Sequence, residues 1–372
     1  MLIGASAVGC AYLWYACNAV AKFAKRAPPR AATQPPVSVL KPLRGEDPAL
    51  AANLRSFLRQ DYGDFQVVFG VAEANDPALA VIRRMRAEFP SADIALMTGQ
   101  AQGTNLKIAN LRNMLPAARH DLLVLADSDM RVGPDYLATV TAPLVSRGAV
   151  GLVTCLYRAI SAGGLWSDLA CLHINHGFLP QAVVGDALGR GSGCFGATMA
   201  LDRATLAAAG GLEALADQLA DDHALGRAVH RLGREVELSP FLVNDIVAED
   251  DIRGLFLHEL RWARTIRLVA PAGFAGSIVT FPVPLALLAL CLGGAPVAAA
   301  AMTVAALAVR GLTGRRIDRA LRLEAAPLWL LPLRDLLSFV VFIASFLGRS
   351  VAWRDRRFRI GPEGQLIPEK PR

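Results

Sequence analysis

Two acidic pairs in this sequence have the residue types and the spacing of a metal or acid–base site. The first, Asp127-Ser128-Asp129, directly follows residues 122–126, an apolar run typical of a strand that is covered on both faces. Two carboxylates at positions i and i+2 after a strand can share Mg²⁺ or Mn²⁺, and these ions commonly bridge to substrate phosphates. A DxD triplet also arises by chance, so its place after a buried strand favours a metal site at Asp127 and Asp129 more than its spacing does.

The second acidic pair, Asp221-Asp222, precedes a helical pattern that Gly233 ends. Acids at the start of a helix commonly cap its amides and complement its dipole, so the pair has an ordinary structural explanation. The functional alternative is that one of the two carboxylates is a general base at the rim of a pocket. Asp76 likewise has an ordinary explanation as a helix N-cap, because Pro77 follows it at a first helical position.

Three arginines, Arg261, Arg264 and Arg267, recur every third residue before a long apolar stretch, and Trp262 lies among them. One interpretation is an interfacial helix whose arginines lie at lipid headgroups. The other is that an arginine neutralises a diphosphate leaving group through its several donors. The glycine-rich run 191–196 formally matches GxGxxG, but no strand precedes it, so we interpret it as the wall of a cleft.

The elements that must position these residues alternate between strand and helix patterns. Residues 37–40, 65–71 and 122–126 have the apolar runs of buried strands, and residues 53–59 and 77–88 have helical spacing. This order predicts an α/β domain of mostly parallel, Rossmann-like sheet, with ligands beyond the carboxyl ends of the strands. The six cysteines show neither CxxC nor metal-ligand spacing, and small buried thiols are expected.

The composition indicates a membrane protein. Hydrophobic residues make up 53% of the 372 residues and charged residues only 19%, which excludes intrinsic disorder. The net charge of +7 is concentrated in three basic patches, 22–30, 310–324 and 349–372, each beside an apolar stretch. This distribution is typical of the cytoplasmic side of a membrane protein rather than of a nucleic-acid-binding protein, so no nucleic-acid partner is expected.

The apolar stretches predict a multi-pass integral membrane protein. The charge-free N-terminal stretch, followed by basic residues, predicts an uncleaved anchor with the following chain in the cytoplasm. A second charge-free stretch is too long for one span, and Gly293-Gly294 and Pro296 interrupt it, so a helix pair and then a basic cytoplasmic loop, 310–322, are expected. A last stretch contains Arg334-Asp335 and reads as re-entrant or interfacial, with this ion pair facing protein. The predicted parts are an anchor at 1–24, the α/β domain at 35–267, a transmembrane helix pair at 268–309, a membrane-embedded segment at 325–348 and a basic cytoplasmic tail at 349–372.

Several of these motifs together resemble the ceramide glucosyltransferases and their bacterial relatives, including the hopanoid-associated glycosyltransferases. The resemblance covers nearly the whole chain, and the order and spacing of the motifs are more specific than any single one. The motifs are Val37–Gly45, Asp76-Pro77-Ala78, Asn105–Leu111, Asp127-Ser128-Asp129, Gly210-Gly211-Leu212, Asp221-Asp222 and Arg261-Trp262.

The resemblance implies a GT-A type transferase that uses a nucleotide sugar at the cytoplasmic face of a membrane. It assigns Asp76 to the uracil base, Asp127 and Asp129 to the metal and diphosphate, and Asp222 rather than Asp221 to the catalytic base. It also assigns Arg261 and Trp262 to the (Q/R)xxRW motif, with His258 at the position that usually holds Gln or Arg. Lys107 matches the NPK segment of the family, with Leu106 in place of proline, and Lys41 and Glu46 are further expected substrate-binding residues.

The expected reaction is a single inverting displacement on a UDP-sugar, either UDP-glucose or UDP-N-acetylglucosamine, by a hydroxyl of a membrane lipid. Mg²⁺ or Mn²⁺ is the expected cofactor, a hopanoid polyol or a ceramide-like lipid the expected acceptor, and a bacterial inner membrane the expected location. A function of another class stays open: a membrane transporter or receptor whose α/β domain binds nucleotide without catalysis. A polysaccharide synthase of the same fold would need more membrane helices than this sequence offers.

Overall fold

The structure is a computed structural model that describes residues 1–45, 47–99, 103–189, 193–323, 327–348, 350–353, 356–361 and 364–368. The chain divides into two compact units. The sheet unit comprises residues 27–157 and 188–246, and the helical unit comprises residues 1–26, 158–187 and 247–372. Residues 158–187 and 247–267, which we predicted within the α/β domain, thus group with the membrane-type helices.

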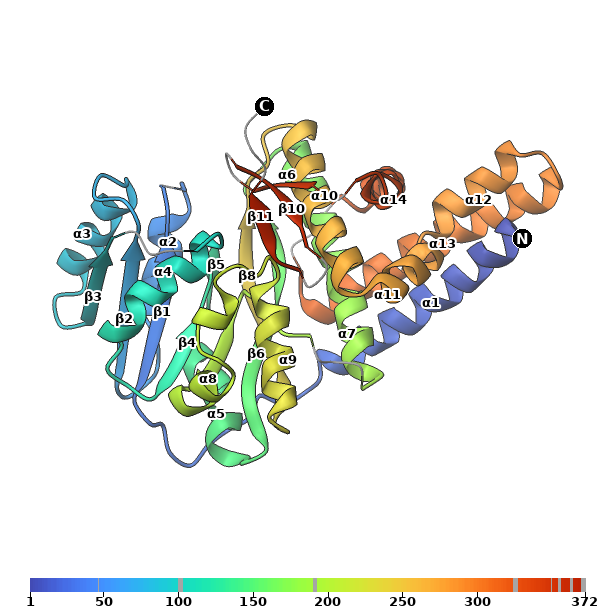
Figure 1. The fold of residues 1–372 in the computed structure, drawn as a ribbon. Helices are drawn as coiled ribbons and strands as arrows, with labels where there is room; N and C mark the ends of the chain where they lie inside the picture. Colours follow the sequence, from blue (N-terminus) through green and yellow to red (C-terminus); the bar gives the residue numbers. More distant parts are fainter. Residues whose placement is uncertain are drawn as a thin grey trace. The chain divides into compact units, whose positions relative to one another are not determined.

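An eight-stranded sheet forms the centre of the sheet unit, in the order β3-β2-β1-β4-β7-β6-β8-β5 (Figure 1). The first four strands in this order are parallel, β7 is antiparallel to β4 and β6, and β5 is antiparallel to β8. The strands are β1 (Val37–Leu43), β2 (Phe65–Val71), β3 (Asp93–Thr98), β4 (Leu122–Leu125), β5 (Met130–Arg131), β6 (Val150–Ser161), β7 (Met199–Asp202) and β8 (Glu235–Val247). The three buried strands predicted from apolar runs are confirmed, and the α/β class is confirmed with them.

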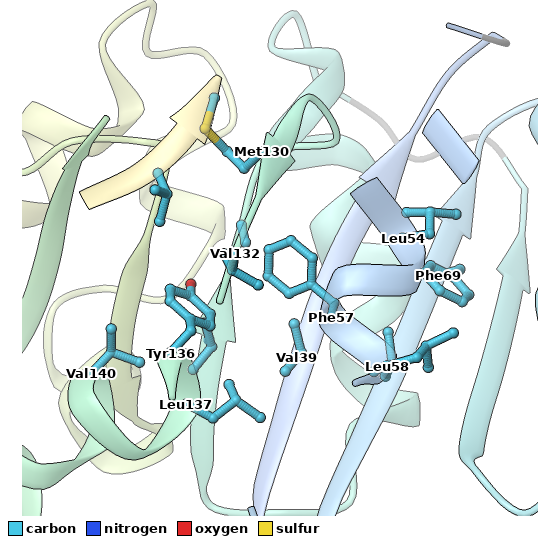
Figure 2. Close-up of a cluster of buried hydrophobic side chains, with 14 of the residues drawn as sticks. Val39, Leu54, Phe57, Leu58, Phe69, Met130, Val132, Tyr136, Leu137 and Val140 are labelled. Carbon is cyan, nitrogen blue, oxygen red and sulfur yellow. The ribbon is translucent and has the colours of Figure 1, made fainter. Parts of the chain in front are cut away.

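Helices cover both faces of this sheet. Successive side chains of a strand point to opposite faces, so one strand contributes to two buried clusters. Val39 of β1 belongs to one buried cluster and Leu40 to the other. Figure 2 shows the first cluster, where Phe57 and Tyr136 meet edge to face at 5.5 Å between ring centroids. The helices of this unit are α2 (Leu50–Leu58), α3 (Ala78–Glu88), α4 (Leu106–Met114), α5 (Tyr136–Ser146), α8 (Arg203–Ala208) and α9 (Asp221–Arg231).

The helical unit contains the apolar helices. Judged by length and hydropathy, three of the described helices could each cross a membrane, and a bent pair would make a fourth. The three are α1 (Leu2–Phe23), α13 (Pro296–Leu321) and a segment, 328–345, that contains α14 (Leu331–Ser345). The other helices are α6 (Leu165–His173), a π-helical turn (Ile174–Phe178), α7 (Leu179–Ala187), α10 (Ile252–Val269), α11 (Pro271–Gly276) and α12 (Pro282–Cys291).

Within this unit, α1 packs along α12 and α13, as Figure 1 shows. The predicted interruption at Gly293-Gly294 is confirmed, since α12 ends at Cys291 and α13 begins at Pro296. The predicted basic loop at 310–322 is wrong, because α13 continues as helix to Leu321. The predicted tail contains a small antiparallel sheet of β9 (Ser350–Trp353), β10 (Arg356–Ile360) and β11 (Leu366–Pro368).

Arg334 and Asp335 both face protein, as predicted, but they do not pair with each other. Arg334 binds both carboxylate oxygens of Glu259 on α10 at 2.8 and 2.7 Å, and Asp335 binds Arg310 on α13 at 2.8 to 3.0 Å. Adjacent residues of a helix point in different directions, so each finds its partner on a different helix. These two buried ion pairs join α14 to α10 and α13.

Candidate active site

The DxD loop joins the central strand β4 to the short strand β5, and hydrogen bonds from Lys41 and Asn53 hold its backbone. The fully buried amine of Lys41, on β1, donates to the backbone carbonyl of Asp127, and it lies 3.8 Å from the ring centroid of Phe57. Burial lowers the pKa of Lys41 to about 7, while the carboxylates of Asp129 and Asp127 oppose this shift. The amide of Asn53 donates to the backbone carbonyl of Asp129 at 3.1 Å.

Asp76 lies after β2, beside the loop that follows β1. Its carboxylate accepts from the backbone amide of Gly45 at 2.9 and 3.0 Å and from that of Ala78, at the start of α3, at 2.9 Å. The structural role expected of this residue, capping of a helix start, is therefore present. The carboxylate also orders the loop after β1. Because β1, β2 and β4 are parallel neighbours, their carboxyl ends place Asp76, Lys41 and Asp127 along one edge of the sheet.

Lys107, in the first turn of α4, is surrounded by acids. Its Nζ lies 2.7 Å from Oδ1 of Asp127 and 3.6 Å from Oδ2 of Asp221. Burial acts against the protonated amine, but the carboxylates of Asp127 and Asp221 outweigh it, and the pKa of Lys107 is raised. Lys107 is therefore a cation that holds acids from two distant segments together.

The two acids at the start of α9 have different surroundings. Asp221 is buried, and its Oδ1 accepts from the side-chain amide of Asn105 at 3.1 Å. Asp222 accepts from the backbone amide of Gly196 at 2.9 Å and from that of His223 at 2.7 Å. Burial and, secondly, the neighbouring Asp221 raise the pKa of Asp222 to about 6. A pKa this close to neutral pH allows the Asp222 carboxylate to accept a proton as a general base.

Gly196 marks the point where these side chains meet. A Cβ atom at this position would lie 3.0 Å from Nζ of Lys107, 3.4 Å from Oδ2 of Asp127 and 3.5 Å from Oδ2 of Asp222. The residues come from α4, from the loop after β4 and from α9, and the glycine lies in the segment before β7. Gly196, which belongs to the glycine-rich run that we interpreted as the wall of a cleft, has no side chain and therefore leaves room among the charged groups.

The DxD residues fit a divalent cation by their chemistry. Desolvation and, secondly, the Asp127 carboxylate raise the pKa of Asp129 to about 6, although solvent still reaches its side chain. Asp127 and Asp129 would hold a divalent cation whose charge would offset this repulsion, and hard oxygen ligands suit Mg²⁺ and Mn²⁺. Among the residues that the structure describes, no three His, Cys, Asp or Glu side chains gather as a metal site. A cation here would therefore take its remaining ligands from water or from substrate phosphates.

Arg261 and Trp262 lie on α10 in the helical unit. On the same helix, Nδ1 of His258 lies 2.9 Å from Oε1 of Glu249, and its ring centroid lies 4.3 Å from that of Trp262. His258, which departs from the family motif, thus packs on the motif tryptophan. Glu46, a further predicted substrate-binding residue, lies outside the residues that the structure describes.

The other arginines of the predicted cationic stripe have protein partners. Arg264 donates to the backbone carbonyls of Leu347 and Ser350, and Arg267 donates to that of Gly348. These carbonyls belong to the segment that follows α14, so the two arginines fix the end of that helix. Each guanidinium has further donors, so a role of these arginines at lipid headgroups stays a prediction.

Asn105 and Gly196 are site residues to which sequence reasoning gave no role of their own. Asn105 was visible only as part of a motif, and Gly196 only as one glycine of a rich run. Asn105 binds Asp221, 116 residues away, and Gly196 binds Asp222, 26 residues away, and no local pattern encodes such contacts.

Comparisons with known proteins identify the family and the fold of the chain. A sequence model described as "Glycosyl transferase family 21" matches residues 1–366. Ceramide glucosyltransferase 1 of Caenorhabditis elegans is 26% identical over 235 residues, which is 62% of this chain and 50% of that protein. Ceramide glucosyltransferase 3 of the same organism is 23% identical over 355 residues, 90% of this chain and 75% of that protein. The chain thus spans half to three quarters of the length of these two relatives.

One solved structure shares the fold over nearly its whole length. The mannosyltransferase PcManGT from Pyrobaculum calidifontis, solved in complex with GDP-Man and Mn²⁺, has a TM-score of 0.53 and 19% identity, and the match covers 93% of this chain and 99% of that one. At this identity the likeness concerns the fold alone, and it confirms the predicted GT-A architecture.

Proposed function

Because the chain belongs to glycosyl transferase family 21, we propose that it is a membrane-bound inverting glycosyltransferase. It moves a hexose or N-acetylhexosamine from a UDP-sugar, UDP-glucose or UDP-N-acetylglucosamine, to a hydroxyl of a membrane lipid such as a hopanoid polyol or a ceramide-like lipid. The observation that carries the proposal is the meeting of Lys107, Asp127 and Asp222 around Gly196, at the edge of the sheet where ligands bind in such folds.

Asp222 acts as the general base in this proposal. It takes the proton from the lipid hydroxyl while that oxygen bonds to the anomeric carbon and the bond from this carbon to the UDP oxygen breaks. Its raised pKa suits this task, whereas both oxygens of Asp221 face Asn105 and Lys107. The different surroundings of Asp221 and Asp222 support the assignment of Asp222 as the base.

The other site residues bind and neutralise the donor. Asp127 and Asp129 would hold a divalent metal, Mg²⁺ or Mn²⁺, which supplies charge stabilisation to the departing diphosphate. Lys107 and Lys41 keep the DxD loop in place, and Asp76 and Glu46 are the residues that we expect to bind the nucleotide. Arg261 and Trp262 complete the set, with Arg261 adding positive charge on the leaving side.

The apolar helices of the chain support a lipid acceptor. Helices long enough to span a membrane occur both before the sheet unit in the chain and after it, which would hold a catalytic domain near the bilayer. We place the domain at the cytoplasmic face of a bacterial inner membrane, with an anchor at 1–24, a helix pair at 268–309, an embedded segment at 325–348 and a basic tail at 349–372. The sugar donor is soluble, and the acceptor need not leave the membrane.

The test is sugar transfer in purified membranes. Each labelled UDP-sugar is supplied in turn, and the glycosylated lipid is identified by mass spectrometry, for the wild type, for Asp222→Asn and for Asp61→Asn, a control at an exposed loop carboxylate. We expect Asp222→Asn to bind the donor but to lose turnover by about 10²- to 10⁴-fold, and the control to match the wild type. EDTA should abolish transfer and weaken donor binding.

Three outcomes would contradict parts of this proposal. Full turnover by Asp222→Asn would remove the base assignment, and indifference to EDTA would remove the metal role of Asp127 and Asp129. Donor binding without consumption by the wild type would favour the nucleotide-binding transporter or receptor instead.

A further inference from the structure

Asn105 is a buried amide whose hydrogen-bonding groups are all used. No part of it is exposed to solvent. Its Oδ1 accepts from the backbone amides of Lys107 and Ile108 at 3.0 and 3.1 Å and so caps α4. Its Nδ2 donates to the backbone carbonyl of Gln218 at 2.8 Å and to Oδ1 of Asp221 at 3.1 Å. A helix cap needs only the oxygen, so the two donors have another use.

The backbone of Asn105 and its neighbour Thr104 also form hydrogen bonds with the segment that contains Gln218. The backbone amide of Asn105 donates to the carbonyl of Ala216 at 2.9 Å. Thr104 donates to Oδ1 of Asp217 from its backbone amide at 3.0 Å and from its hydroxyl at 2.8 Å. The loop before α4 and the loop before α9 are therefore joined by a series of hydrogen bonds, and Asn105 lies at the end nearest the acids.

This junction fixes Asp221 on both sides. Asn105 binds Oδ1, and Nζ of Lys107 lies 3.6 Å from Oδ2, so both oxygens of this buried carboxylate face α4. Asp221 and Asp222 are consecutive residues at the start of α9, and they point about 100° apart around the helix axis. Holding Asp221 against α4 therefore sets the direction of Asp222, which faces the amide of Gly196.

We propose that Asn105 is a positioning residue of the catalytic base: by binding Asp221 it orients the first turn of α9, so that the carboxylate of Asp222 lies beside Lys107 and Asp127. Asn105 acts through Asp221 and touches neither substrate nor metal. The inference rests on the proposed function, in which Asp222 is the base, and it adds a residue whose contribution is separate from helix capping.

Conservative variants separate the two roles. Asn105→Ser keeps an oxygen that can cap α4 but loses both amide donors, and Asn105→Asp keeps the cap while placing a second carboxylate against Asp221. Asn105→Ala loses the cap as well. Thr104→Val is the matched control, because it removes a hydroxyl hydrogen bond of the same junction without a contact to Asp221. Steady-state transfer, thermal midpoint and amide hydrogen exchange of the peptide that starts α9 are measured for each.

We expect Asn105→Ser to keep the thermal midpoint and the KM for the UDP-sugar while kcat falls by about 10- to 100-fold, the loss typical of a displaced catalytic group. Asn105→Asp should lose more, Thr104→Val should match the wild type, and only Asn105→Ala should also melt earlier. Amide exchange at the start of α9 should become faster in Asn105→Ser and Asn105→Asp.

A wild-type kcat in both Asn105→Ser and Asn105→Asp would overturn the inference, and so would an equal loss in Thr104→Val. If the wild type transfers no sugar to any lipid, the proposed function fails by itself. Amide exchange then still decides the positioning role, because unchanged exchange in Asn105→Ser would mean that Asn105 does not hold the start of α9.

Discussion

The pKa of Asp222 makes a quantitative prediction about the pH dependence of transfer. A general base works as the carboxylate, so activity falls as the pH drops through its pKa, which is about 6. With this pKa about 91% of Asp222 is ionised at pH 7 and about 9% at pH 5, which predicts a roughly tenfold loss of kcat between these values. A carboxylate of ordinary pKa, 3.8, would lose less than about a tenth of its ionised form over the same range.

The variant Asp221→Asn tests the cause of this shift. Burial is the first cause and the Asp221 carboxylate the second, so removing that charge should move the acid limb to lower pH without returning it to the ordinary value. The asparagine retains an oxygen for the amide of Asn105. Lys107 acts in the opposite direction, since its positive charge lowers the pKa of Asp222.

The pKa of Asp129 is also raised to about 6, by burial and then by the carboxylate of Asp127. Asp221 is not among its causes, so Asp221→Asn should leave Asp129 unchanged, and a cation held by Asp129 would keep this carboxylate ionised across the assay range. The assay is the initial rate of transfer to membrane lipid from pH 5 to 8, with saturating donor and constant ionic strength. A kcat that stays flat down to pH 5, or an acid limb that moves up in Asp221→Asn, would refute the reasoning.

Two further predictions concern packing. Gly196→Ala should lower kcat while leaving the thermal midpoint nearly unchanged, because its Cβ would lie 3.0 Å from Nζ of Lys107, whereas Gly63→Ala, with no atom within 4 Å of its Cβ, serves as the neutral control. Equal kcat in both variants would count against the crowding. Arg334→Met should destabilise the helical unit by about 3–5 kcal/mol, since it leaves the buried Glu259 carboxylate unpaired, and Glu259→Met combined with Arg334→Met should recover most of that loss. Thermal unfolding in detergent checks this, and additive losses would contradict it.

The sequence made the buried strands and the order of the motifs predictable. Strands β1, β2 and β4 are mostly apolar and buried on both faces, and such runs are distinctive. By contrast β3, the outer strand of the sheet, has mostly half-buried residues, and its mixed pattern gave no comparable signal. The metal-type loop was placed correctly at the edge of the sheet because parallel neighbours end at the same side.

Long-range charge partners could not be predicted in the same way. Arg334 and Asp335 were expected to pair because they are adjacent, yet residues i and i+1 of a helix do not face each other. The periodic arginines of α10 were expected at lipid or diphosphate, and no sequence pattern indicated that Arg264 also binds carbonyls after α14. Identifying these partners requires the packing of segments that lie from 25 to 86 residues apart in the chain.

The choice between Asp221 and Asp222 shows what the structure adds. Both residues satisfy the sequence arguments for a helix cap and for a base, and their types are identical. Their directions differ by about 100° around the helix axis, so the two carboxylates face different neighbours. The interior position is occupied by the residue that Asn105 and Lys107 bind, and that residue is Asp221. Asp222 then keeps an environment that raises its pKa, and this makes it the carboxylate suited to accept a proton from an attacking hydroxyl.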